Sequence, residues 1–396
     1  MIVTMGSWIV AFLADGRIAR WRNEGTDPLI SPDRTITMFG SEIEILAKST
    51  ACVIQSAALI MTPDYRYLYG QSVEGGFRDI TATICNALSL GHTELSDNIT
   101  GMLAGNDFVA VRTDDRVCIM APPYNSPNDN HIMHHKVYSF SSSINLFCYQ
   151  NNRAFIRTGN GKLYVIGVYY YGMGNTIDWH DHREIRVKDA LSISEIVYTE
   201  SHILFLTKGG RVCGHKFTYR DSDEISGPFD TITFPEPESE SVAKIVCNQY
   251  VIIYVTLNGN CYFVRQFSHP TRIEQLSGRF VTNAFILHDH IIVQYDTGRL
   301  CSIGLTQEPY DLTRSPLEQM VTYDLGPVID LPFFDDKNVV SVMESCGIYF
   351  VSSSGQVYWS RNLEPGYSIE TISFFDSNPV AIDISCTIPS AQSMLK

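Results

Sequence analysis

The chain has 396 residues and a formal net charge of -14, from 29 Lys and Arg against 43 Asp and Glu. This acidic balance argues against binding to nucleic acid or to an anionic membrane surface, because both need clustered cations. With 44% hydrophobic and 18% charged residues, the chain can bury a large core and is too apolar for a disordered protein.

Eight segments follow one nine-residue frame, in which about five apolar residues lead to a polar turn and then to a second apolar-alternating run. This is the pattern of a β-hairpin. The residue that closes the turn recurs at spacings of 39 to 57 residues. In chain order the frames are 8–16 (WIVAFLADG), 57–65 (AALIMTPDY), 107–115 (DFVAVRTDD), 153–161 (RAFIRTGNG), 202–210 (HILFLTKGG), 251–259 (VIIYVTLNG), 290–298 (HIIVQYDTG) and 347–355 (GIYFVSSSG).

The turns share a chemistry. The closing residue is usually glycine, which adopts a positive φ at no steric cost. Arg, a β-branched residue or Leu, and then a small residue follow in Gly16-Arg17-Ile18-Ala19, Asp115-Arg116-Val117-Cys118, Gly210-Arg211-Val212-Cys213 and Gly298-Arg299-Leu300-Cys301. We expect the Arg on the solvated side, the next residue in the core, and the Ala or Cys at a tight place between neighbouring sheets.

A further apolar segment precedes each hairpin, for example residues 43–46, 243–246 and 339–342. That segment, a hairpin and a last strand give four strands in a unit of about 48 residues, as in a propeller blade. Helical signals are scarce, because no capped stretch has a 3.6-residue period. The sequence therefore predicts an all-β protein, with residues 1–396 forming a single β-propeller of four-stranded blades.

The two ends of the chain favour ring closure. Residues 379–384 have the pattern of a strand that precedes a hairpin, yet no hairpin follows them. The matching hairpin is present at the other end, in residues 8–21. Joining N- and C-terminal strands in one blade would remove the open sheet edge, which is otherwise an aggregation hazard.

Several positions of the frame resemble the repeat of the RCC1 (regulator of chromosome condensation) family, in divergent form. The residues that carry the resemblance are Ala104-Gly105, His202 and His290 eight places before the turn-closing residue, Thr62, Thr207 and Thr256 three places before it, and the glycines of GKLYVIGVYYYG at 161–172. The resemblance implies an RCC1-like propeller. That family has seven blades, whereas this sequence has eight hairpins, so seven and eight blades are both open.

No pattern of catalytic or cofactor-binding residues is present. The sequence has no P-loop, dinucleotide fingerprint, nucleophile elbow or H-E-x-x-H motif, which predicts a non-enzyme without cofactors.

His180 with His182, and His288 with His290, could share a strand face and bind a metal, but both pairs are short and unpartnered, so we expect no metal site. The cluster of His131, His134 and His135 is interpreted in the same way. The carboxylates of two polar loops are expected to be solvated surface, and they are Asp221, Asp223, Glu224, Glu236, Glu238 and Glu240.

Candidate partner contacts are Tyr169, Tyr170 and Tyr171, which follow the best-matching hairpin. Exposed aromatic residues there would make a binding hot spot, and packing between blades is the alternative. The long loops 121–136 and 219–241 are further candidates, because loops on a rigid scaffold often carry function.

These observations predict a non-catalytic scaffold that binds one or more proteins, and one setting would be an architectural subunit of a larger assembly such as a cytoskeletal one. The alternative, implied by the resemblance, is a guanine-nucleotide exchange factor for a Ran-like small GTPase.

The ten cysteines form no C-x-x-C pair, no apolar run reaches the ~18 residues of a membrane span, and the start lacks a signal peptide's basic region. We therefore expect a cytoplasmic protein that binds neither nucleic acid nor membrane.

Overall fold

In the computed structural model, the described residues are 2–5, 8–12, 17–22, 34–37, 50–54, 57–61, 65–70, 78–104, 108–121, 134–150, 153–170, 177–179, 183–187, 190–199, 202–216, 229–230, 232–248, 251–264, 269–307, 323–331, 339–344, 348–352, 357–360, 362–363 and 370–371. Two compact units divide the chain. The first unit comprises residues 1–191, 225–229 and 373–396, and the second comprises residues 192–224 and 230–372. That residues 1–396 form one domain stays a prediction.

The first unit carries four antiparallel sheets among its described residues. In sheet order their strands are β1 (Ile2–Met5), β2 (Trp8–Phe12), β3 (Arg17–Arg22) and β4 (Arg34–Thr37); β5 (Thr50–Ile54), β6 (Ala57–Met61), β7 (Tyr67–Gly70) and β8 (Arg78–Asp79); β9 (Gly101–Ala104), β10 (Val109–Arg112), β11 (Arg116–Ala121) and β12 (His134–Ser139); and β13 (Ile144–Gln150), β14 (Arg153–Thr158), β15 (Leu163–Tyr170), β17 (Arg183–Arg186) and β21 (Phe229–Asp230), with β16 (Ile177–Trp179) beside β15. Three short helices lie between β8 and β9, and they are α2 (Thr81–Leu88), η2 (His92–Glu94) and α3 (Leu95–Asn98).

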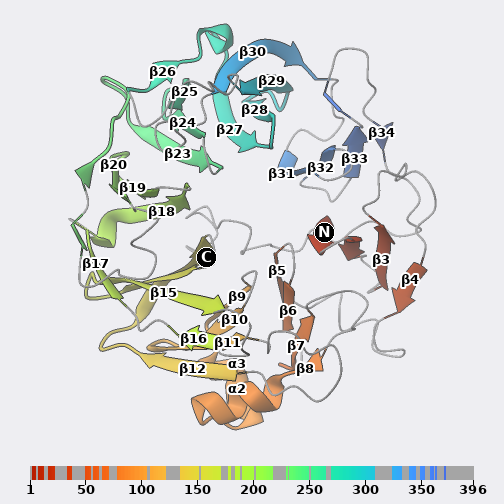
Figure 1. The fold of residues 1–396 in the computed structure, drawn as a ribbon, viewed down its shortest axis with the longest axis vertical. Coiled ribbons are helices and arrows are strands. Elements are labelled where there is room, and N and C mark those ends of the chain that lie inside the picture. Colours follow the sequence, from red (N-terminus) through yellow and green to blue (C-terminus); the bar gives the residue numbers. More distant parts are fainter. Residues whose placement is uncertain are drawn as a thin grey trace, which may run out of the picture. The chain divides into compact units, whose positions relative to one another are not determined.

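The second unit carries four four-stranded antiparallel sheets among its described residues, and they follow one another in chain order (Figure 1). Their strands are β18 (Ile193–Tyr198), β19 (His202–Thr207), β20 (Val212–Lys216) and β22 (Ile232–Thr233); β23 (Val242–Cys247), β24 (Ile252–Thr256), β25 (Cys261–Val264) and β26 (Thr271–Arg272); β27 (Val281–Ile286), β28 (His290–Tyr295), β29 (Leu300–Gln307) and β30 (Tyr323–Asp330); and β31 (Val339–Glu344), β32 (Ile348–Ser352), β33 (Val357–Ser360) and β34 (Glu370–Thr371). One-turn helices η3 (Ala190–Ser192) and η4 (Glu274–Leu276) precede β18 and β27.

Each of the eight predicted hairpins is confirmed as the second and third strands of one sheet. The first is β2 with β3, in which Trp8 pairs with Arg22, and the eighth is β32 with β33, in which Ile348 pairs with Ser360. The described residues thus form eight sheets. The protein is all-β, and its repeating antiparallel four-stranded sheet is the blade of a β-propeller.

Two of the predicted preceding strands differ from the structure. The strand before the second hairpin is β5 at 50–54 and not the apolar run at 43–46, which lies outside the described residues. Ile54 pairs with Ala57, so a two-residue connection brings the nearer run into register. The strand before the first hairpin is β1, in which Met5 pairs with Trp8. Residues 379–384 lie outside the described part of the chain, and closure through them stays a prediction.

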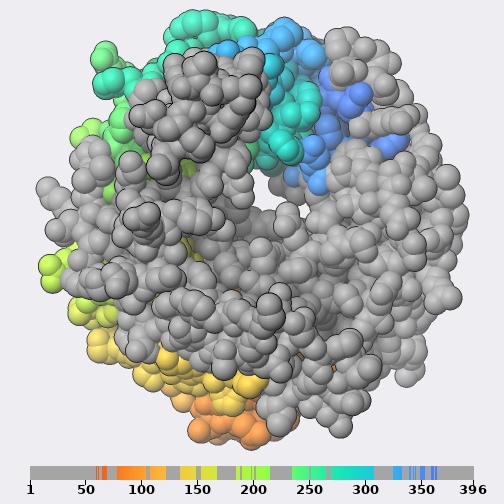
Figure 2. Space-filling model, in the orientation of Figure 1, coloured from red at the N-terminus to blue at the C-terminus, as the bar shows by residue number. Residues whose placement is uncertain are grey.

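The described residues contain few helices, as predicted, and α2 is the longest of them. Its buried residues Thr81, Ile84 and Leu88 recur at helical spacing, and Ile84 and Leu88 join a core shared by β6, β7, β10 and β11. Eight residues are too short a stretch for that period to stand out in the sequence. The helix and its neighbours lie at the lower rim of the view (Figure 2, orange).

The hairpin turns have the geometry that their glycines predict. Gly161, Gly210, Gly259 and Gly298 have φ between 73° and 83°, and Tyr65 occupies the same place with φ 60°. Each of these glycines donates its N–H to the carbonyl three residues earlier, over 2.9 to 3.0 Å. This is a three-residue loop whose last residue is left-handed, as in a hairpin that ends in a glycine bulge.

Two of these glycines also allow the next sheet to approach. A Cβ on Gly210 would lie 2.6 Å from Cβ of Ser241, and a Cβ on Gly259 would lie 2.5 Å from Cγ of Phe280. The carbonyls of these glycines accept the N–H groups of Val242 and Val281, at 3.1 and 2.9 Å. At these two hairpins the closing residue is therefore the point where one sheet is joined to the first strand of the next.

The predicted inward and outward positions are confirmed where side chains are described. Val117, Val212 and Leu300 are at most 1% exposed, whereas the Arg211 side chain is 75% exposed. The small residues Cys118 and Cys301 are fully buried, in clusters that two neighbouring sheets share. Cys213, in contrast, is only partly buried.

The first strands of three successive sheets in the second unit are linked by buried polar contacts. A carboxylate oxygen of Glu195 on β18 accepts the N–H of Ile245 on β23 at 3.3 Å. Nζ of Lys244 on β23 donates to Oδ1 of Asn283 on β27. Burial raises the pKa of Glu195 to about 7, against the opposing effects of the Ile245 N–H and of Lys244. Burial also lowers the pKa of Lys244.

Glu195→Gln should remove part of the pH dependence of stability. Because folding raises the pKa of Glu195 from 4.5 to about 7, its contribution to the free energy of unfolding is full below pH 4.5 and is lost as the pH rises through 7. Glutamine keeps the acceptor for Ile245 and cannot ionise. Urea unfolding from pH 5 to 8 should show the wild type losing on the order of 1–3 kcal/mol relative to this variant. Parallel curves would contradict the assignment.

Candidate functional site

The hairpin turns and the connections between sheets lie at the same end of the strands. In an antiparallel four-stranded sheet, the turn between strands two and three and the exit from strand four share one edge. In the second unit, backbone hydrogen bonds join each turn to a connection between sheets. The N–H of Lys208 donates to the Ser192 carbonyl at 2.6 Å, that of Leu257 to Ser241 at 3.0 Å, and that of Asp296 to Phe280 at 2.9 Å. We call these turns and connections, residues 192, 207–211, 236–241, 256–260, 278–280, 295–299 and 330, the turn edge of the second unit.

Two carboxylates that were predicted to be solvated surface instead hold the turn edge together. Glu236 accepts the N–H of Val212 at 2.6 Å and pairs with Arg211 at 3.1 Å. The Glu240 carboxylate accepts three side-chain hydrogen bonds, from Thr256 at 2.6 Å and from Asn260 and Tyr262 at 2.8 Å each. Burial acts to raise the pKa of Glu240, but these three hydrogen bonds outweigh it and lower that pKa. The prediction was wrong for Glu236 and Glu240, because the sequence of a loop does not show which turn the loop packs against.

Large hydrophobic side chains are exposed at this edge. Among the described residues of the second unit they are Leu257, 67% exposed, and Phe280, 46% exposed. Leu257 belongs to the turn that Gly259 closes, and the Phe280 ring lies against that same glycine. In the first unit, exposed Tyr65 and Leu191 occupy the equivalent places, a turn and a connection.

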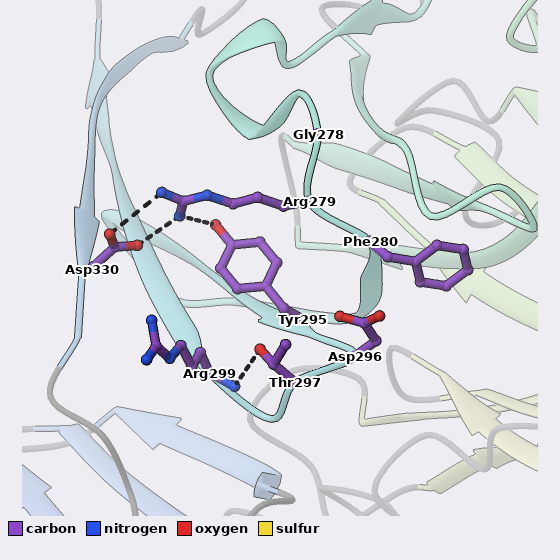
Figure 3. Close-up of a pocket in the computed structure, with 8 residues that line it drawn as sticks. All are labelled: Gly278, Arg279, Phe280, Tyr295, Asp296, Thr297, Arg299 and Asp330. Carbon is purple, nitrogen blue, oxygen red and sulfur yellow. Dashed lines mark hydrogen bonds and ion pairs between the residues drawn. The ribbon is translucent and has the colours of Figure 1, made fainter.

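A pocket of about 390 Å³ opens beside Phe280 and is lined by Gly278, Arg279, Phe280, Tyr295, Asp296, Thr297, Arg299 and Asp330 (Figure 3). Arg279 donates from Nη1 to Oδ1 of Asp330 at 2.6 Å and to Tyr295 Oη at 2.8 Å, and from Nη2 to Oδ2 of Asp330 at 3.4 Å. Tyr295 in turn donates its hydroxyl proton to Sγ of Cys301 at 2.9 Å. The side chains of Arg279 and Arg299 extend to the Asp330 side of the Tyr295 ring, whereas Phe280 and Asp296 lie on the other side (Figure 3).

The electrostatics of the pocket fix the charges of these groups near neutral pH. The hydrogen bonds from Arg279 to Asp330 and Tyr295 raise the pKa of the guanidinium. Burial, followed by the contact with Cys301, raises the pKa of Tyr295. Tyr295 is therefore a neutral phenol and Arg279 a cation, so neither can act as a general base.

The tyrosines that the sequence singled out are placed only in part. Tyr169 and Tyr170 belong to β15, where their backbones pair with Asp178 and Ile177 of β16. Their side chains and the whole of Tyr171 lie outside the described residues, so a role in binding stays a prediction for them. Residues 122–133 of the first candidate loop lie outside the described part, as do residues 219–228 and 231 of the second, whereas residues 236–241 belong to the turn edge.

The histidine pairs are not brought to a metal-binding arrangement where they are described. His288 is exposed, and Nδ1 of His290 lies 2.5 Å from the Asp289 carboxylate. His180, His182 and His131 lie outside the described residues. No group of three or more potential metal ligands occurs within the described part of the chain. No described helix is long and apolar enough to cross a membrane.

The buried cysteines behave as core residues. Burial raises the pKa of Cys118 and of Cys261 to about 12, so both are thiols at neutral pH. His202, at the position where the RCC1 repeat has histidine, is 5% exposed and meets the Phe234 ring edge-on at a centroid distance of 5.4 Å.

No family model and no curated protein matches the sequence. Solved structures that are similar to it include human WBSCR16 (10% identity, TM-score 0.46, 71% of this chain and 84% of that chain) and BamB from Moraxella catarrhalis (13%, 0.46, 90% and 92%). Prp20p from Saccharomyces cerevisiae, the yeast RCC1, is a third (9%, 0.42, 77% and 82%). Its published descriptions concern binding to Gsp1p, histones and Kap60. The yeast RCC1 is thus among the structures that this chain resembles, and at TM-scores below 0.5 the resemblance assigns no activity.

The exposed hydrophobic residues and the pocket of the turn edge were not predicted from the sequence, whereas residues 236–241 belong to the loop 219–241 that was a candidate. Leu257 and Phe280 are single hydrophobic residues in polar surroundings, and Arg279 and Asp330 are 51 residues apart. The available signal was Leu257, a large apolar residue at a turn position where the eight hairpins have no other Leu, Ile, Val, Met or aromatic residue.

Proposed function

We propose that this protein is a non-catalytic scaffold that binds a partner protein at the turn edge of the second unit. The observation that carries the proposal is the position of the exposed hydrophobic residues. Single exposed hydrophobic residues are ordinary on a protein surface. Here, however, Leu257 and Phe280 flank one glycine, and the exposed residues of the first unit occupy the same kind of position.

The surroundings favour a preorganised binding surface. The Phe280 carbonyl accepts the Asp296 N–H, and the Val281 N–H donates to Gly259, so the backbone under the Phe280 ring is held from two turns. A rigid surface loses little conformational entropy when it binds. Aromatic and Arg side chains in such places are typical of interface hot spots.

The polar groups of the pocket support a structural role over a chemical one. Arg279, Asp330, Tyr295 and Cys301 form one hydrogen-bonded chain across the end of the sheet. Arg279 is committed to a carboxylate and a phenol, and Tyr295 is neutral. This arrangement stabilises the edge of β28, β29 and β30.

The double variant Leu257→Ser/Phe280→Ser should lose the native partner. We expect gentle affinity purification with the wild-type chain to recover a stoichiometric protein, and at least about a tenfold lower recovery with the double variant, since hot-spot truncations often exceed 1.4 kcal/mol. Leu257 is 67% exposed and Phe280 46%, so we expect the thermal midpoint to fall modestly and the chain to stay folded.

His288→Ala serves as the matched control, since His288 is exposed in the connection between β27 and β28, at the opposite end of the strands. Equal recovery with the double variant and the wild type would refute binding at the turn edge. A small GTPase as the stoichiometric partner would favour the exchange-factor alternative, and release of labelled GDP would then test it.

A further inference from the structure

In three of the four glycine-closed turns that the structure describes, the residue after the glycine contacts a glutamate. Nζ of Lys162 lies 2.9 Å from the Glu184 carboxylate, and Nη1 of Arg211 lies 3.1 Å from the Glu236 carboxylate. At the next turn, Nδ2 of Asn260 donates to Glu240 at 2.8 Å. Glu184 lies on β17 and Glu236 follows β22, the last strand of its sheet, whereas Glu240 precedes β23, the first strand of the sheet that contains Asn260. At each of these three turns a glutamate of the same sheet or of its connections receives the polar side chain that follows the turn.

Arg299 occupies this position in the turn that Gly298 closes, and within the described part of the chain it has no such carboxylate. None of the described residues accepts a hydrogen bond from its guanidinium or lies in an ion pair with it. The acid at the end of the last strand of this sheet is Asp330, and both of its oxygens are taken by Arg279. The Arg299 side chain is nevertheless exposed and lines the pocket on the same side as Asp330 (Figure 3).

We propose that the carboxylate missing at Arg299 is supplied by a partner protein, from an Asp or Glu side chain next to an apolar residue that covers Phe280. This inference rests on the proposed function, because it names the chemistry of the partner at the same edge. A guanidinium presents a planar pair of donors that matches a carboxylate. Phe280 and Arg299 line the two sides of one pocket, so an acidic and an apolar side chain of one segment can reach both.

The net charge of the chain limits which partner surfaces can bind here. A charge of -14 repels a strongly acidic surface at long range. The partner segment therefore has a single carboxylate that acts at short range, within a neutral or basic surface. The internal pairs of Lys162 and Arg211 provide the template for the contact.

The test uses the full chain and fluorescein-labelled 12-residue peptides in a Gly/Ser background. Each peptide has one Phe, Leu or Trp and one Glu, separated by zero to three residues, and a matched series has Gln in place of Glu. Fluorescence polarisation should find at least one Glu peptide that binds about tenfold more tightly than its Gln counterpart. Arg299→Ala should abolish that preference, and Arg299→Lys should retain part of it.

Lys162→Ala is the matched control, because Lys162 holds the same position in a turn of the first unit, outside the turn edge of the second unit, and already pairs with Glu184. This variant should bind the peptides as the wild type does. Equal binding of Glu and Gln peptides, an unchanged preference in Arg299→Ala, or no peptide binding up to 1 mM would each overturn the inference. Tighter binding of a phosphoserine peptide than of its Glu counterpart would overturn the choice of a carboxylate.

The two proposals fail separately. If the native partner is lost with Leu257→Ser/Phe280→Ser and retained with Arg299→Ala, the turn edge remains the binding surface and the proposed carboxylate contact is refuted. If the native partner binds Leu257→Ser/Phe280→Ser as it binds the wild type, the proposed function is refuted, whatever the peptides show.

Discussion

Val212→Pro should destabilise the second unit by about 3 kcal/mol or more. Val212 begins β20, is fully buried, and donates its N–H to Glu236 at 2.6 Å while its carbonyl accepts the Phe234 N–H at 3.1 Å. Proline has no N–H to donate, so the buried end of the Glu236 carboxylate would lose its partner. Its ring would also replace a valine side chain packed in the core between two neighbouring sheets. Differential scanning calorimetry should show a transition that is lost or shifted far down.

Val212→Ala is the control for this change, since it removes two methyl groups and keeps the N–H. We expect that variant to cost about 1–3 kcal/mol, mostly from the lost apolar burial. A soluble Val212→Pro protein with an unchanged thermal transition would contradict the assignment of this residue to a central strand.

Gly210→Ala should be much more destabilising than Gly278→Ala. Both glycines have a left-handed backbone, with φ 75° and 80°, so an alanine at either site pays the same strain of about 1–2 kcal/mol. The two sites differ in the space available for a methyl group. A Cβ at 210 would come within 2.6 Å of Cβ and 3.1 Å of Cα of Ser241 and within 3.0 Å of the Val242 carbonyl, whereas a Cβ at 278 meets nothing within 4 Å.

Because two of the atoms facing Gly210 are backbone atoms, the next sheet must move to admit the methyl group. Chemical unfolding of the two variants should therefore give a gap of at least about 1 kcal/mol, with Gly210→Ala the less stable. Equal losses at the two sites would show that the approach of the Ser241 connection to the turn contributes nothing to stability.

Much of the fold was accessible from the sequence because its signals are local. The two-residue alternation of apolar residues and the glycine at the end of the frame specify a hairpin without reference to the rest of the chain. That is why all eight hairpins were predicted, and why Val212 and Leu300 were placed in the core. The strand before the second hairpin was misplaced because two apolar runs, 43–46 and 50–54, compete for one partner and only pairing decides between them.

The candidate site was not accessible in this way. Whether Glu240 is solvated or receives Thr256, Asn260 and Tyr262 depends on which turn the connection crosses, and no periodicity records it. The same applies to Phe280, whose exposure follows from its position over Gly259.

The sequence by itself determined the all-β class, the eight hairpins and the left-handed glycines of their turns, since each depends on residues that are neighbours in the chain. Only the tertiary structure decided which charges are neutralised. Arg279 and Arg299 are alike in the sequence, yet Asp330, 51 residues from Arg279, pairs with Arg279 alone among the described residues. The physical reason is that an ion pair forms within about 4 Å, a distance set by how the ends of strands meet and not by their order along the chain.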